Sequence, residues 1–177
     1  MLTMRRTTWI AAPVERVFRL AACLDLQLLA GERRGLRILA GRGQGLLAGG
    51  DRITWRQRVL GLPIRYQTEV NVWHPHHHFR TMMLLGPLRS YHHDRYFAAQ
   101  NDGTRLQDEV TLRPGGVTAW LPTAVLRSQL QKRLLERNAR LKQVAESNDW
   151  HTYLDHAPEI AAEVYLAQDA GERFLAG

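Results

Sequence analysis

The sequence predicts an α+β fold in which a curved antiparallel β-sheet wraps around one long C-terminal helix. A strand-like segment and a short amphipathic helix open the chain, five strand-like segments joined by short turns follow, and a long amphipathic helix reaches about residue 146. Consecutive strands joined by short turns form an antiparallel meander. A curved sheet of this kind buries its concave face against the one helix long enough to cover it. We therefore expect an internal cavity between sheet and helix.

The first strand is expected from Met4 to Ile10, and a short helix follows it. Pro13 suits the first turn of a helix, where its missing N–H removes no hydrogen bond. Apolar residues then recur at helical spacing to about Leu24, namely Val14, Val17, Phe18 and Ala21. Cys23, the only cysteine, lies within this predicted helix with no base nearby. We interpret it as a small buried apolar residue rather than a nucleophile.

The glycine-rich run GRGQGLLAGGD (41–51) is followed by the strand-like RITWRQRV rather than by a helix. A phosphate-binding loop needs a helix N-terminus directly after it, so turn and bulge chemistry is the better interpretation. The turn sequence Asn101-Asp102-Gly103 separates the last two expected strands. The expected strands are Arg52–Leu60, Ile64–Trp73, Phe79–Leu85, Arg89–Gln100 and Thr104–Leu112.

The long helix follows Pro114-Gly115-Gly116 and carries one apolar stripe. That stripe consists of Leu126, Leu130, Leu134, Leu141 and Val144. The basic residues Arg127, Lys132, Arg133, Arg137 and Arg140 are assigned to its polar faces.

Composition places the chain among ordinary globular proteins. Of its 177 residues, 45% are hydrophobic and 23% charged, and no apolar run approaches the ~20 residues that span a bilayer. With one cysteine and no secretory leader pattern, we expect a cytoplasmic protein. The net charge of +7 is compatible with an anionic partner such as RNA or an anionic membrane surface, but the basic residues are scattered among acidic ones, so a solvated basic surface is the favoured interpretation. DNA is not expected.

Several segments resemble one superfamily. The segments GPLRSYHHDRYF, TRLQDEVTLRPGG and LLERNARLKQV, together with IAAPVERVF and GGDRITW, resemble the SRPBCC superfamily, which has the START-like or helix-grip fold. More narrowly, the chain is similar to bacterial ligand-binding proteins described as polyketide cyclase or dehydrase. Within that pattern Phe79, Gly86, Pro87, Tyr91 and His93 fall at matching places.

The resemblance covers residues 3 to 146, and it implies a helix-grip fold whose cavity binds a hydrophobic or amphipathic small molecule. Members of the superfamily commonly carry acidic and amide residues between Phe79 and Gly86, where this chain has RTMMLL. Met83 therefore predicts a more apolar, adaptable wall. We expect a helix-grip domain at 1–147 and a C-terminal extension at 148–177, a short helix starting near Pro158 or a partly ordered tail.

The histidine cluster WHPHHH falls at an expected hairpin tip. His74, His76, His77 and His78 are predicted to be exposed and to point in different directions. Zinc requires three or four ligands in tetrahedral array, and no paired spacing on one helix face is present. We expect neither a physiological metal site there nor a cofactor.

Alternation places Tyr91, His93, Arg95 and Phe97 on one face of the next strand, and because this face carries the large aromatics we expect it to point inward. With the Asn-Asp-Gly turn between them, Arg95 comes opposite Asp108, and an inward pair of this kind must be an ion pair. The polar residues Tyr91, His93, Arg95 and Asp108 are interpreted either as a buried network that fixes the sheet or as a polar spot that orients a ligand. His93 is also the candidate catalytic residue, as a general acid or base near neutral pH.

Three functions stay open from the sequence. The first is binding or carrying of a hydrophobic small molecule, the second a cyclase or dehydratase using His93, and the third RNA or membrane binding through basic faces. For the third, Arg52, Arg56 and Arg58 line one strand face, but Thr54 between them is not aromatic. The first is favoured, and the candidate ligand-binding residues are Trp55, Tyr66, Met83, Tyr91, His93, Arg95, Phe97, Asp108, Leu126 and Leu130.

Overall fold

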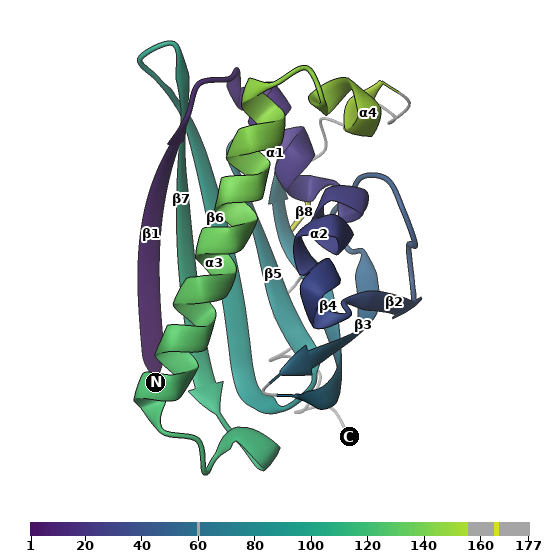
Figure 1. Cartoon of the computed structure of the whole chain (residues 1–177), viewed down its shortest axis with the longest axis vertical. Helices are drawn as coiled ribbons and strands as arrows, with labels where there is room; N and C mark the ends of the chain where they lie inside the picture. The colour runs from purple at the N-terminus through teal and green to yellow at the C-terminus, as the bar shows by residue number, and fades with distance from the viewer. Residues whose placement is uncertain (60, 156–164, 167–177) are drawn as a thin grey trace.

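In a computed structural model of the chain, a curved antiparallel sheet holds a long helix against its concave face (Figure 1). The structure describes residues 1–59, 61–155 and 165–166. The expected fold class is confirmed, including the order of strand, short helix, meander and long helix. The main path of the sheet runs β1-β7-β6-β5-β4-β3-β2, and along it β1 departs from sequence order by pairing with β7. Its strands are β1 (Leu2–Ile10), β2 (Arg37–Ala40), β3 (Arg52–Val59), β4 (Leu62–His74), β5 (His78–Leu85), β6 (Leu88–Gln100) and β7 (Gly103–Pro114).

Register irregularities help to curve the sheet. Pairing shifts between Gln67 and Thr68 and between Val70 and Val72 on β4, and between Leu88 and Ser90 on β6. Each such bulge bends a strand and increases its twist.

The helix α3 (Thr123–Glu146) lies across the concave face and packs at both ends (Figure 1). Its N-terminal half contributes Leu130 and Leu134 to an apolar cluster with residues of β1 and β7. Its C-terminal half contributes Leu141 and Val144 to a larger cluster centred on α1 (Val14–Ala22). Between these two clusters α3 faces the sheet with polar residues such as Arg137 and Asn138, and the candidate site lies there.

The segment after α1 differs from expectation. Cys23 lies between two helices rather than inside one, and a second helix, α2 (Leu24–Gly31), continues into the 3-10 helix η1 (Glu32–Arg34). The sequence did not predict α2 because six of its eight residues are apolar or glycine, which hides any helical period. Cys23 is fully buried, as expected, and forms an isolated bridge with Leu46.

The β4–β5 hairpin corrects the expectation of an exposed histidine tip. Of the four histidines there, only His77 is exposed. The ring of His76 meets the edge of Phe18, with centroids 5.5 Å apart, and His78 belongs to β5. His78 Nε2 lies 2.7 Å from Asp94 Oδ1 on the neighbouring strand. Because the hairpin folds back over α1, its histidines make structural contacts that turn propensity alone does not indicate.

Past α3, the helix α4 (Trp150–Leu154) packs on α1, where Leu154 is buried. The strand β8 (Tyr165–Leu166) pairs with β4. The helix predicted from Pro158 lies outside the described residues, so the division at residue 147 stays a prediction. Among the described residues, no helix is long and apolar enough to cross a membrane.

Candidate ligand-binding pocket

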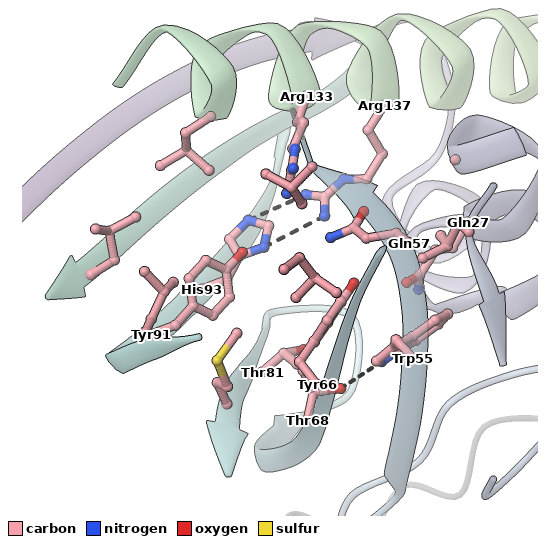
Figure 2. A pocket seen from close by; sticks show the side chains of 18 of the residues that line it. Gln27, Trp55, Gln57, Tyr66, Thr68, Thr81, Tyr91, His93, Arg133 and Arg137 are labelled. Carbon is pink, nitrogen blue, oxygen red and sulfur yellow. Dashed lines mark hydrogen bonds between the residues drawn. The ribbon is translucent and has the colours of Figure 1, made fainter. Parts of the chain in front are cut away.

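A pocket of about 260 Å³ lies between α3 and the concave face of the sheet. The size is close to the lower end of the ~300–1,000 Å³ typical of small-molecule sites. Strands β3 to β6 form its floor, α3 its roof, and α2 with η1 one side (Figure 2). Apolar and aromatic side chains predominate on the walls: Leu36, Ile53, Trp55, Ile64, Tyr66, Val70, Phe79, Met83, Leu88, Tyr91, Leu112, Leu121, Val125, Leu126, Leu130 and Leu134.

Most of the candidate residues meet at this pocket. The structure places eight of them on its walls, namely Trp55, Tyr66, Met83, Tyr91, His93, Arg95, Leu126 and Leu130. The other two, Phe97 and Asp108, are not among its lining residues. Phe97 packs on Phe18 of α1 with ring centroids 5.1 Å apart, because the helix occupies that end of the concave face. Asp108 lies behind the wall.

Asp108 is the centre of a buried polar network. Its carboxylate, fully buried, accepts hydrogen bonds from His93 Nε2 at 2.7 Å, Arg137 Nη2 at 3.0 Å and Asn138 Nδ2 at 2.6 Å. Arg95 is its direct partner across β6 and β7, as expected, with Nε 3.6 Å away. Burial alone would raise the pKa of Asp108, but the His93 hydrogen bond and the charge of Arg137 outweigh it and hold the pKa well below its usual range.

His93 is neutral and has both ring nitrogens engaged. Burial, followed by the charge of Arg137, lowers its pKa to about 4, against the raising effect of Asp108. The carboxylate at Nε2 fixes the neutral tautomer with its proton on that nitrogen. Nδ1 is then the acceptor, and it faces Arg137 Nη1 at 3.5 Å. Neither nitrogen of His93 is left to act on a molecule in the pocket.

Arg95 is also committed to the protein. Its Nη1 donates to the carbonyl of Ala21 at the end of α1, at 2.6 Å, and its guanidinium lies 5.2 Å from the centre of the Phe79 ring. Burial, with the nearby charge of Arg137, lowers the pKa of Arg95 to about 9, although Asp108 raises it. Arg95 therefore ties α1 to the sheet.

Two of the five basic residues that were assigned to the polar faces of α3, Arg133 and Arg137, line the pocket instead, whereas Arg127 and Lys132 are exposed as expected. Figure 2 shows Arg133 and Arg137 pointing from α3 into the pocket. Asn138, which the sequence did not single out, is 1% exposed and holds Asp108. One signal existed in the sequence: the apolar stripe has no member between Leu134 and Leu141, and Arg137 and Asn138 fall in that gap. A polar interruption in a buried stripe indicates a polar partner on the facing sheet.

Polar groups on the floor are few. Trp55, which lines the pocket, donates from its Nε1 to Thr68 Oγ1 at 2.8 Å (Figure 2). The phenols of Tyr66 and Tyr91 make no hydrogen bond with any residue that the structure describes, and burial raises the pKa of both. Both phenols are therefore protonated donors. Within the described part of the chain, no group of three or more His, Cys, Asp or Glu side chains is placed to hold a metal.

Comparisons with known proteins agree with this architecture. The model of the family described as polyketide cyclase / dehydrase and lipid transport matches residues 1–146. Similar solved structures include the protein TTHA0849 of Thermus thermophilus, 23% identical with a TM-score of 0.57, where the match covers 82% of this chain and 94% of that one. A START superfamily protein from Mycobacterium smegmatis is 15% identical, with a TM-score of 0.61 over 81% and 97% of the two chains.

The di-domain ARO/CYC protein StfQ from the steffimycin biosynthetic pathway is 14% identical, with a TM-score of 0.61 over 83% of this chain and 51% of that one. No curated protein matches the sequence. At these identities the solved structures establish the fold, and the helix-grip prediction is confirmed.

Proposed function

The chain belongs to the polyketide cyclase / dehydrase and lipid transport family, within the SRPBCC superfamily, and from that premise we propose that its pocket binds or carries a hydrophobic or amphipathic small molecule. One observation carries the proposal: an apolar pocket of about 260 Å³ lies between two packed clusters of the core. Protein interiors normally leave few voids larger than a water molecule, and an apolar guest would gain dispersion contacts with the walls of a space of this size.

The alternative, a cyclase or dehydratase that uses His93, has weaker support. A general base at neutral pH works best with a pKa near that pH, whereas burial and Arg137 lower the pKa of His93 to about 4. Its protonated nitrogen donates to Asp108, and the other faces Arg137. These contacts favour a structural role for His93.

A fluorescence titration tests the binding function. The probe is N-phenyl-naphthylamine, a neutral dye whose emission rises in apolar surroundings, and we expect a micromolar Kd, about −8 kcal/mol. Met83 lines the pocket. Met82, the residue before it on β5, is not among the lining residues and lies opposite His92 on β6. Met83→Trp should fill the pocket and weaken dye binding, while overpacking reduces stability by about 1–3 kcal/mol. Met82→Trp is the matched control and should bind as the unmodified protein does.

The two variants distinguish dye binding in the pocket from dye binding at the surface. Absence of dye binding by the unmodified protein, or equal binding by both tryptophan variants, would contradict the proposal. Thermal unfolding of each variant checks that the fold is retained.

A further inference from the structure

We propose that the ligand of this pocket is an acid, whose carboxylate, sulfonate or phosphate binds the guanidinium of Arg133 while its apolar body lies over the sheet. The inference rests on the proposed function and names the chemical class of its ligand. It starts from the charges on the pocket wall.

The pocket wall carries more positive than negative charge. Four arginines and one carboxylate line it: Arg34, Arg95, Arg133, Arg137 and Asp51. The carboxylate is already used, since Asp51 Oδ2 accepts from Arg42 Nε at 2.8 Å and from the Ala48 amide at 2.8 Å.

Three of the four arginines have partners within the protein. Arg34 pairs with Glu136 of α3. Arg95 and Arg137 share the single charge of Asp108, at 3.6 and 3.0 Å. Two guanidinium groups against one carboxylate leave an excess of one positive charge even before Arg133 is counted.

Arg133 has no counterion among the described residues. It makes no hydrogen bond or ion pair with any of them, and its Nε is buried without a partner. The nearest acidic side chain on the helix, Glu136, is engaged by Arg34. Burial lowers the pKa of Arg133, but a guanidinium stays charged near neutral pH. A half-buried charge of this kind is costly unless it is paired, so the pocket favours an anionic guest.

The surroundings of Arg133 suit an acid with an apolar body. Figure 2 shows Arg133 pointing from α3 toward the space bounded by Tyr66, Tyr91 and His93. The two phenols have no partner among the described residues and are protonated, so each can donate to an anionic oxygen. A planar guanidinium binds carboxylate, sulfonate or phosphate through paired N–H donors. The aromatic and aliphatic walls then contact the remainder of the molecule.

Two dyes that differ by one charge test this inference. N-phenyl-naphthylamine is neutral, and anilinonaphthalene sulfonate has the same rings with an added sulfonate. The folded protein should bind the sulfonate at least about tenfold more tightly, the effect of one charge-assisted contact. Arg133→Met should remove that preference and leave binding of the neutral dye within about twofold. Arg127→Met, which removes an exposed charge from the same helix, is the matched control and should keep the preference.

The outcomes distinguish this inference from the proposed function. Equal affinity of the unmodified protein for both dyes would overturn the acid ligand and leave a binding pocket. Failure of both dyes to bind would overturn the pocket function itself. A preference that survives in Arg133→Met, or disappears in Arg127→Met, would overturn the assignment to Arg133.

A second readout does not depend on any ligand. Since Arg133 is an unpaired, half-buried charge in the free protein, Arg133→Met should raise the midpoint of thermal unfolding by ~2–4 °C. A lower midpoint would show that Arg133 has a structural partner and would overturn the premise.

Discussion

Replacement of Asp108 by alanine should be one of the most damaging single changes in this chain. The carboxylate is fully buried and accepts hydrogen bonds from β6 and from two residues of α3. Its removal leaves Arg95, 4% exposed, without a negative charge. Asp108 therefore holds α3 on the sheet and neutralises the arginines behind the pocket.

The expected loss is about 3–5 kcal/mol of unfolding free energy, the usual effect of removing one partner of a buried ion pair. Three of its contacts are hydrogen bonds shorter than or equal to 3.0 Å, which are strong because the acceptor is charged. A loss of this size is a large fraction of the ~5–15 kcal/mol that stabilises a typical domain. Asp108→Asn keeps the shape and part of the hydrogen bonding, so it should lose less.

Urea unfolding followed by circular dichroism measures the change as a shift of the transition midpoint. Glu109, the next residue on β7, is the matched control because its partner Arg5 lies on the exposed face. Glu109→Ala should have a much smaller effect, as surface ion pairs contribute little. If Asp108→Ala and Glu109→Ala shift the midpoint equally, the buried network around Asp108 contributes no more to stability than an exposed ion pair.

Two other predictions concern histidines. Because burial and Arg137 lower the folded pKa of His93 to about 4 from its ordinary value of 6.5, the unfolded chain binds the extra proton between these values, so stability falls by roughly 3 kcal/mol as the pH drops from 6.5 to 4. In His93→Gln the titrating imidazole is gone, while its neighbours Asp108, Arg95, Arg137 and Tyr91 remain, so the dependence of stability on pH, measured by urea unfolding, should become flatter. An equally steep dependence in His93→Gln and in the exposed control His77→Gln would refute this prediction. On the opposite face of the sheet, His78→Ala should reduce the free energy of unfolding by about 1–2 kcal/mol because Asp94 loses a hydrogen-bond partner. The control His77→Ala should leave stability unchanged, and equal thermal midpoints of the two variants would contradict a structural role for His78.

The meander could be predicted because its strands carry strong local signals. Residues such as Asn101 and Asp102 adopt positive φ at 49° and 56°, the conformation that a tight turn before Gly103 requires. Once that turn sets the register, Arg95 must face Asp108, and the structure confirms that pairing.

The partners of that pair could not be predicted so easily. Arg137 and Asn138 reach Asp108 from a helix about thirty residues further along the chain, and local period assigned Arg137 to the outside. Similarly, nothing in the sequence of β6 indicates that α1 takes Phe97 away from the pocket. Such contacts depend on the position and angle at which each helix crosses the sheet, and the pattern of apolar and polar residues does not determine these.

The methyl groups of Met82 and Met83 offer the most direct test of where this protein binds its ligand. A methyl NMR titration with anilinonaphthalene sulfonate compares two neighbouring residues of one strand, of which only Met83 lines the pocket. Binding in the pocket predicts a large, saturable shift of the Met83 methyl and little change at Met82, and in Arg133→Met the same shift should need about tenfold more dye. A shift at Met82 without one at Met83, or shifts confined to amides near Arg52, Arg56 and Arg58, would contradict pocket binding and favour a basic surface.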